Sequence, residues 1–235
     1  MRLDKYITEQ YDIQSRNKAS ELIKANKVLV NNVIIKKPSF NIEGNEVVTI
    51  NEEEFFVSRS AYKLKYFLED NHLNVENKIA IDIGSSTGGF TQILLNNGIK
   101  SVTCVDVGTN QLHKSIKNDK RIIIEENTDI RKFISTHAYE VVTCDVSFIS
   151  ILNILNDIDR LSSKEIIILY KPQFEVGRNI KRDNNGVVLD IEAIKQERLN
   201  FLDHTKKLNW KFEFANESKL AGKSGNIEEL FYFTK

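Results

Sequence analysis

The chain of 235 residues is poor in the residue types on which several protein classes depend. It has two cysteines, Cys104 and Cys144, and each lies inside an apolar run. No cysteine–histidine spacing is typical of zinc binding, and the four histidines are scattered outside any motif. A disulfide scaffold, a metal site and catalysis by histidine are therefore not expected. Both cysteines are predicted to be small buried residues.

Long apolar runs are also lacking. The longest are short, such as residues 166–170, whereas a helix that crosses a bilayer needs about 20 apolar residues. The first residues, Met1 to Lys5, are not followed by the apolar region of an export signal. A cytoplasmic protein is expected, with no membrane among its partners.

The net charge shows no excess of either sign, because 33 basic residues face 33 acidic ones. The charges are unevenly distributed, since residues 1–40 hold eight lysines and arginines against four acids. A basic segment attracts phosphate groups, although a basic helix face is also commonly just solvated. The charge pattern thus allows nucleic-acid binding at the start of the chain without requiring it.

Residues 1–50 predict a small α+β domain. Apolar residues recur there at helical spacing over two stretches, with Ser15 placed to cap the second helix and Asn26 to end it. Two β-branched runs then flank Asn31-Asn32, and asparagine tolerates the positive φ of a two-residue hairpin turn. A third strand follows at residues 46–50 and completes a small sheet.

From residue 58 onward, strands and helices alternate, which is typical of a doubly wound α/β fold with a mostly parallel sheet. Seven strands are predicted, at residues 78–83, 101–106, 121–125, 140–145, 165–170, 210–215 and 229–234. Helices are predicted from Ser58 and at residues 89–97, 110–118, 149–161 and 191–208. The last two strands suggest an antiparallel edge. The sequence therefore predicts a linker at residues 51–57 and an α/β domain at residues 58–235.

The first strand of this domain runs through Asp82 into the loop Gly84-Ser85-Ser86-Thr87-Gly88-Gly89-Phe90. Glycine after the first strand lets a ligand approach the backbone closely at the carboxyl edge of the sheet. A pyrophosphate usually needs Gly-x-Gly-x-x-Gly, and a carboxylate beside it would repel its charge. The pattern Gly-x-x-x-Gly-Gly after an acid favours a cationic ligand instead. S-adenosylmethionine, with its sulfonium and ammonium groups, is such a ligand.

Acids also stand at three further strand ends, at Asp106, Asp129 and Asp145. Asp106 is placed to accept the ribose hydroxyls of a nucleoside cofactor, and Asp129 to accept its adenine amino group. Any one of these acids is more simply explained as a helix cap. Four acids at one edge of the sheet, with Asp82, favour a cofactor site.

Lys171 follows the apolar run at residues 166–170, close to the predicted strand that ends at Asp145. Burial favours the neutral amine, which can take a proton from a hydroxyl group. A neighbouring carboxylate favours the charged form, and the sequence leaves open which effect prevails. Lys171 is the candidate base, and Asp145 the group that orients it.

Taken in order along the chain, these motifs resemble the TlyA family of rRNA ribose 2′-O-methyltransferases over nearly the whole length. The start, from Arg2-Leu3-Asp4-Lys5-Tyr6 to Asn31, resembles the RNA-binding module named after ribosomal protein S-four. The rest resembles an FtsJ-type methyltransferase. The blocks that carry this second resemblance are residues 57–64, 82–91, 145–150, 171–177 and 224–228.

The resemblance implies a Rossmann-like class I methyltransferase domain that uses S-adenosylmethionine and acts on ribosomal RNA or ribosomal subunits. It implies no protein partner. The Lys-Asp-Lys-Glu catalytic residues of the family fall on Lys63, Asp145, Lys171 and Glu228. Without the resemblance, Lys63 would be taken for a solvated helix residue and Glu228 for a strand-edge residue. The predicted RNA contacts are Arg2, Lys5, Arg16, Lys18, Lys24 and Arg59.

The chain departs from the family pattern at three positions. Ser85 replaces a frequent alanine, Asp129 a common asparagine, and Asn32 the usual hairpin glycine. The short C-terminus and the lack of extra N-terminal residues resemble the form that acts mainly on large-subunit RNA. Two alternatives stay open: a non-catalytic RNA-binding assembly factor and, least expected, a haemolysin, a name that this family sometimes carries.

Overall fold

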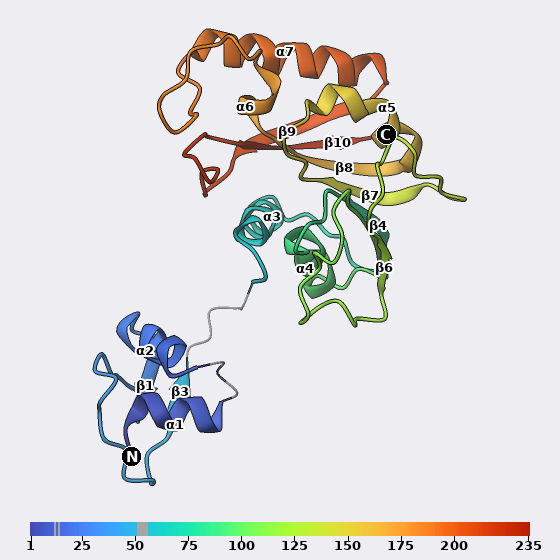
Figure 1. Ribbon diagram of the computed structural model, residues 1–235. Coiled ribbons are helices and arrows are strands. Elements are labelled where there is room, and N and C mark those ends of the chain that lie inside the picture. Colours follow the sequence, from blue (N-terminus) through green and yellow to red (C-terminus); the bar gives the residue numbers. More distant parts are fainter. Residues whose placement is uncertain (12, 14, 51–55) are drawn as a thin grey trace. The chain divides into compact units, whose positions relative to one another are not determined.

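The computed structural model describes residues 1–11, 13, 15–50 and 56–235, which form two compact units, one up to residue 50 and one from residue 56 (Figure 1). Most of the predicted linker, residues 51–57, lies outside the described residues. Phe56 and Val57 pack against the core of the second unit, and the Val57 amide donates to Gln92 Oε1 at 2.9 Å. The folded part of the second unit therefore begins before residue 58.

The first unit packs two helices on a three-stranded antiparallel sheet of order β2-β1-β3. Its elements are α1 (Leu3–Gln10), α2 (Arg16–Lys24), β1 (Val28–Val30), β2 (Val33–Ile34) and β3 (Val48–Ile50). Ser15 caps α2 by accepting from the Lys18 amide at 3.2 Å, and Asn26 follows the helix with φ 63°. Asn31-Asn32 forms the turn with φ of 50° and 64°. The predicted cap, stop and hairpin are confirmed.

The second unit is built on a seven-stranded sheet of order β6-β5-β4-β7-β8-β10-β9. Its strands are β4 (Ile79–Ile83), β5 (Ser101–Val105), β6 (Ile122–Glu125), β7 (Tyr139–Cys144), β8 (Ser162–Tyr170), β9 (Lys211–Glu217) and β10 (Glu229–Thr234). The strands from β6 to β8 are parallel, and β10 is antiparallel to both β8 and β9. The predicted α/β class with a mostly parallel seven-stranded sheet is confirmed.

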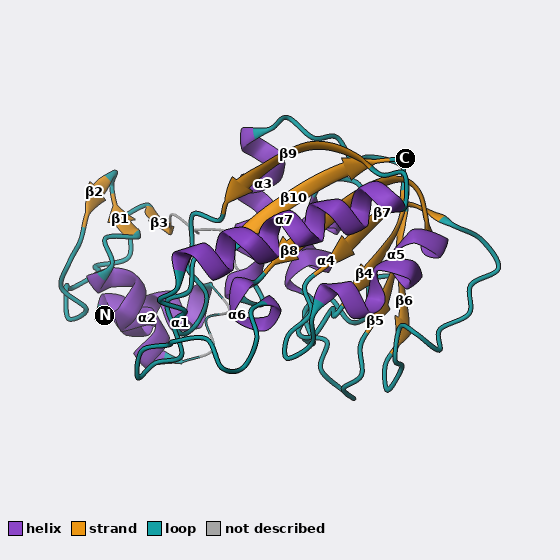
Figure 2. Ribbon diagram, turned by 90° about the horizontal axis from the view of Figure 1, so that it is seen from above, coloured by secondary structure: helices purple, strands orange, loops and turns teal. Residues whose placement is uncertain are grey.

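Helices cover both faces of this sheet, because successive strand residues point to opposite sides. Ala80 packs with α3 (Arg59–Asp70) and α4 (Gly89–Asn96), while Ile81 packs with α5 (Leu155–Leu161) and α7 (Ile191–Lys207). The short helices η1 (Ile151–Ile154) and α6 (Pro172–Glu175) lie next to α5 and α7 respectively. In Figure 2, α7 runs alongside β10, and Phe201 of α7 meets Phe231 and Phe233 of β10 edge-on. The buried core thus holds the carboxyl ends of the parallel strands in fixed positions.

The predicted helix at residues 110–118 is wrong, since the chain forms turns there. Asn110 has φ 53°, and the amides of Asn110 and Gln111 donate to the Glu126 carboxylate at 2.6 and 2.9 Å. The His113 amide donates to the carbonyl of Thr87 at 3.2 Å. These amides are bound by residues from other loops, and this tertiary anchoring outweighs the helical spacing of the segment.

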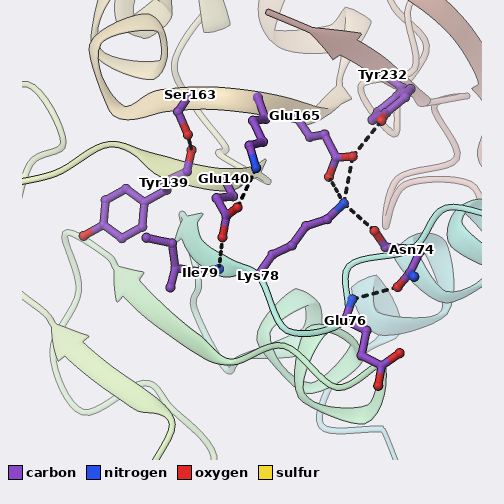
Figure 3. A network of polar contacts seen from close by, with 10 residues as sticks. Asn74, Glu76, Lys78, Ile79, Tyr139, Glu140, Ser163, Glu165 and Tyr232 are labelled. Carbon is purple, nitrogen blue, oxygen red and sulfur yellow. Dashed lines mark hydrogen bonds and ion pairs between the residues drawn. The ribbon is translucent and has the colours of Figure 1, made fainter.

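A polar network ties the strands together at the end of the sheet where the parallel strands begin (Figure 3). Lys78 Nζ lies 2.8 and 2.7 Å from the two carboxylate oxygens of Glu165, and Tyr232 donates to Glu165 at 3.2 Å. Glu140 accepts from the Ile79 amide at 3.1 Å. The network links β4, β7, β8 and β10 at one edge, and the opposite, carboxyl edge carries the candidate site.

Candidate active site

Two adjoining cavities lie at the carboxyl edge of the sheet. The larger has a volume of about 670 Å³ and is lined from α3, the loop after β4, the segments after β7 and β8, and the turn before β10. The smaller, of about 400 Å³, is lined from the segments after β4, β5, β6 and β7. The residues that line both are Gly84, Ser86, Asp145, Ser147 and Phe148.

One ion pair in the larger cavity joins Lys171 to Asp145. Both residues directly follow neighbouring parallel strands, β8 and β7, so the sheet register brings them together. Lys171 Nζ lies 2.5 Å from Asp145 Oδ1 and donates to Ser147 Oγ at 2.9 Å. Lys171 is only 8% exposed. The amine is therefore fixed at the cavity wall by two oxygen atoms.

A second ion pair joins Lys63, on α3, to Glu228, which directly precedes β10. Both side chains are buried. Lys63 binds one oxygen of the Glu228 carboxylate, and the other oxygen accepts from Gln173 Nε2 at 2.9 Å. A Cβ at Gly222 would lie 2.4 Å from that second oxygen, so a side chain there would displace the Glu228 carboxylate. All four residues of the predicted catalytic set thus line one cavity.

The loop after β4 forms the boundary between the two cavities. Gly84 has φ 78°, and a Cβ there would lie 2.7 Å from the carbonyl oxygen of Asp145. Its amide and that of Ser85 donate to the carbonyl of Val105, which ties the loop to β5. Only glycine allows this close approach between the two loops.

The other predicted loop residues take different positions. Ser85, Ser86 and Phe90 line the larger cavity, and Phe90 is also part of the core. Gly88 and Gly89 do not line either cavity: Gly88 caps α4 and Gly89 is its first residue. These two glycines shape the start of the helix that supports the loop.

Asp82 lines the larger cavity but is fully buried. One carboxylate oxygen accepts from the Thr91 amide at 3.0 Å and from Thr91 Oγ1 at 2.7 Å, and the other accepts from Thr143 Oγ1 at 2.8 Å. Desolvation outweighs these hydrogen bonds and raises the pKa of Asp82 to about 6. Both oxygens are thus engaged within the protein, where they link α4 to the sheet.

Asp106 and Asp129 both line the smaller cavity. Asp106 accepts from the Ser86 amide at 2.8 Å and from the Gly108 amide at 2.7 Å, which leaves lone pairs on both oxygens. Asp129 is held by the Arg131 guanidinium, whose hydrogen bonds lower the pKa of Asp129 to about 2. Asp129 is therefore ionised near neutral pH, and both acids face the same cavity.

The predicted RNA contacts fall on both units. In the first unit Arg2 and Arg16 both pair with the buried carboxylate of Asp4, at 2.7 and 3.1 Å. The Arg2 hydrogen bond is the main cause that lowers the pKa of Asp4 to about 2. Lys5, Lys18 and Lys24 have exposed side chains on α1 and α2. Arg59, in the second unit, lines the larger cavity and donates to the Ala221 carbonyl at 3.1 Å.

Three residues at the site were not singled out from the sequence: Ser147, Phe148 and Gln173. Ser147 and Phe148 lie in the block around Asp145, and Gln173 lies two residues after Lys171. Phe148 is 92% exposed, has φ 65°, and its ring centroid lies 5.3 Å from that of Phe174. An exposed aromatic residue with positive φ is uncommon, and this one stands where the two cavities meet.

Two family descriptions match this chain: "S4 domain" over residues 1–48 and "FtsJ-like methyltransferase" over residues 56–235. The chain is also similar to the 23S rRNA (cytidine-2'-O)-methyltransferase TlyA of Campylobacter jejuni, with 45% identity over 254 aligned residues and 100% coverage of both chains. The chain belongs to the TlyA family. It is accordingly an S-adenosylmethionine-dependent methyltransferase, as the sequence predicts.

TlyA relatives carry two kinds of name. The 16S/23S rRNA (cytidine-2'-O)-methyltransferase TlyA of Mycobacterium tuberculosis is 34% identical, over 98% of this chain and 88% of the relative. A solved structure from Streptococcus thermophilus carries the name hemolysin, with 31% identity, a TM-score of 0.72, and coverage of 100% of this chain and 88% of that one. Within the described ranges of the present chain, no helix is long and apolar enough to span a membrane.

Proposed function

We propose that this protein transfers the methyl group of S-adenosylmethionine to the 2′-hydroxyl of a cytidine in ribosomal RNA. The observation that carries the proposal is the meeting of Lys63, Asp145, Lys171 and Glu228 in a cavity that adjoins the glycine loop. The relatives named for rRNA cytidine-2′-O-methylation and the S4 domain support this substrate. Such a substrate places the enzyme with the ribosomes, in the cytoplasm.

The smaller cavity fits the adenosine part of the cofactor. Its walls include apolar side chains from four strand ends, and two acidic residues, Asp106 and Asp129, face it. We assign Asp106 to the ribose hydroxyls and Asp129 to the adenine amino group, through the lone pairs that their present partners leave. The close approach at Gly84 lets the chain of the cofactor pass toward the larger cavity. When bound there, S-adenosylmethionine supplies an electrophilic methyl group on a sulfonium centre.

Lys171 is assigned as the general base. It must act as a neutral amine, which takes the proton of the 2′-hydroxyl while the oxygen attacks the methyl carbon. The ammonium that results is stabilised by Asp145 at 2.5 Å and donates to Ser147. These partners also fix the direction of the amine, so that the reacting oxygen meets it in a defined orientation.

Lys63 and Glu228 are assigned to holding the nucleotide. Their ion pair is buried in the wall of the larger cavity, which Lys171 and Asp145 also line. A paired ammonium still has hydrogens to donate to ribose or phosphate oxygens, and a paired carboxylate still has lone pairs. The pair thus orients the acceptor without adding net charge to the site.

We assign two sets of cationic side chains to RNA binding. The first unit offers Arg2, Lys5, Arg16, Lys18 and Lys24, and phosphate contacts of this kind position the protein without reading sequence. In the second unit Arg59, Arg182 and Lys223 line the larger cavity, where they can bind phosphates next to the target nucleotide. We favour large-subunit RNA, because identity is 45% to the relative named for 23S rRNA and 34% to the one named for 16S/23S rRNA.

The proposal is tested by transfer of a tritiated methyl group onto naked rRNA and onto assembled 30S and 50S subunits, followed by mapping of the methylated ribose. Label on a cytidine 2′-oxygen of the large subunit is expected. Calorimetric binding of S-adenosylmethionine without incorporation into any RNA would contradict the proposal. It would favour a non-catalytic assembly factor.

A further inference from the structure

The side chains of the short helix α6 and of the lysine before it reach the site in several directions. Lys171 binds Asp145 and Ser147, and the Phe174 ring packs against Phe148. Gln173 reaches the other ion pair, where its Nε2 donates to Glu228 Oε1 at 2.9 Å. One short segment is therefore connected to both ion pairs of the cavity, through Lys171 on one side and Gln173 on the other.

The contact between the Gln173 side-chain amide and Glu228 is energetically costly in one respect. Its Nε2 donates to Glu228, but its Oε1 is buried and, within the part of the chain that the structure describes, accepts no hydrogen bond. A buried acceptor without a partner is unfavourable, and native structures contain few of them. The orphan oxygen is a consequence of the contact with Glu228, because the carboxylate faces the donating end of the amide.

The Glu228 carboxylate needs two hydrogen-bond donors to be held in a single orientation. Lys63 binds one oxygen, and a single contact of this kind leaves the carboxylate free to turn about it. The Gln173 amide binds the second oxygen without bringing a charge, so that Lys63 keeps the whole charge of its partner. The backbone of Gln173 is fixed independently, since Arg182 donates to its carbonyl at 3.0 Å.

We propose that Gln173 is a positioning residue for the methyl-transfer reaction, acting through Glu228. It fixes the Glu228 carboxylate, and through it the Lys63 ammonium, in the orientation that receives the acceptor nucleotide. This inference rests on the proposed function of the cavity. It predicts that Gln173 matters for turnover only while Glu228 is an acceptor.

The test begins with Gln173→Leu, which keeps the approximate size and removes the amide. Turnover with a saturating rRNA substrate should fall about 10- to 100-fold, the range for a hydrogen bond to a charged group, with an unchanged dissociation constant for S-adenosylmethionine. Gln196→Leu, on the exposed side of α7, is the matched control and should keep wild-type turnover. Wild-type turnover in Gln173→Leu would overturn the inference.

A double-mutant cycle separates positioning from general structural damage. If Gln173 acts through Glu228, then Gln173→Leu added to Glu228→Gln should cost little beyond the Glu228→Gln loss. Losses that multiply would overturn the inference, since Gln173 would then act by another route. Gln173→Glu is the second variant: two adjacent carboxylates favour protonation, so the acidic limb of its pH–rate profile should move to higher pH. A profile that superimposes on the wild type would count against the inference.

A readout without RNA distinguishes failure of this inference from failure of the proposed function. The side-chain amide of Gln173 gives an NMR signal that can be assigned by its loss in Gln173→Leu. It should shift in Glu228→Gln and stay in place in Glu229→Gln, whose carboxylate pairs with Arg198 instead. If wild-type protein methylates no RNA but this shift occurs, the proposed function fails and the contact stands. If the shift is absent, the inference fails whatever the activity.

Discussion

Lys171 and Asp145 reach the same point from two neighbouring parallel strands, with Nζ and Oδ1 2.5 Å apart. Each residue comes directly after its strand, so the pairing of β7 with β8 sets this distance. The contact needs no loop to fold in a special way. The pairing of two parallel strands therefore brings both side chains to one point at the carboxyl edge of the sheet.

Lys171→Ala should lower turnover by about 10²–10⁴-fold, the usual contribution of a general base. The dissociation constant for S-adenosylmethionine should barely change, because Lys171 lines the larger cavity and not the smaller one. Lys171→Arg should be nearly as damaging, since a guanidinium does not give up its proton. Single-turnover methyl transfer measures the effect, with the exposed Lys195→Ala on α7 as control. Near-native turnover in Lys171→Arg would mean that Lys171 acts as an electrostatic clamp.

Asp106→Ala should weaken binding of S-adenosylmethionine by about 1–3 kcal/mol, as expected when buried hydroxyls lose their acceptor. Asp106 also accepts from the Ser86 amide at 2.8 Å, so part of the loss comes from a looser loop. Titration calorimetry measures the affinity, and Asp203→Ala, on the exposed side of α7, serves as control. Equal affinity in Asp106→Ala and wild type would remove Asp106 from the cofactor site.

Deleting residues 1–50 should abolish productive RNA binding and leave cofactor binding intact. The first unit has a core of its own, formed by eight buried residues among those that the structure describes, and the second unit begins by residue 56. Affinity of the full-length protein for RNA should fall steeply with salt, because lysines and arginines that bind phosphates release counterions. Filter binding at several salt concentrations checks both statements. A truncated protein that methylates subunits at the full-length rate would refute this division of labour.

Local sequence patterns predict much of this fold, because turns and strands depend mainly on residues that are close together in the sequence. The Asn31-Asn32 turn and the alternation of strands follow from short-range rules of conformation and periodicity. The prediction of a helix at residues 110–118 was wrong because Glu126, distant in sequence, binds amides of that segment. The same limit applies to the site: Lys171 and Asp145 follow from strand ends, while the pairing of Lys63 with Glu228 spans 165 residues and has no local pattern.

Phe148→Gly should lower turnover without a matching loss of stability. The φ of 65° is unfavourable for phenylalanine and acceptable for glycine, so the substitution relieves strain. The ring is 92% exposed, and its removal costs the contact with Phe174. We expect the free energy of unfolding to change by no more than about 1 kcal/mol. Thermal unfolding and methyl transfer measure the two effects, and unchanged turnover would show that the exposed ring has no part in binding the acceptor.

Asp82 should make the free energy of unfolding of the second unit fall as pH rises, the opposite of the usual effect of an aspartate. Burial raises the pKa of Asp82 to about 6 in the folded protein, whereas an aspartate that is not buried has a pKa of 3.8. Between these values the folded state binds more protons than the unfolded state, so this group's contribution to the free energy of unfolding falls as pH rises. Above pH 6 the full cost of the buried charge remains, about 3 kcal/mol. Stabilisation from this carboxyl is therefore complete below pH 4 and lost by pH 6.

Asp82→Asn removes this titration while keeping the size of the side chain. Urea unfolding of the wild type and of Asp82→Asn at several pH values between 4 and 7 should show a stability difference that shifts in favour of the variant up to about pH 6 and then stays constant. The carboxyl of Asp4, whose pKa is lowered to about 2, acts in the opposite direction, but it titrates below this window. The lost hydrogen bonds to Thr91 and Thr143 can make the variant less stable at every pH, yet they add only a constant offset. Two parallel stability curves would show that the carboxylate is buried at no cost to the charged form, and the assignment of desolvation as the dominant effect would then be wrong.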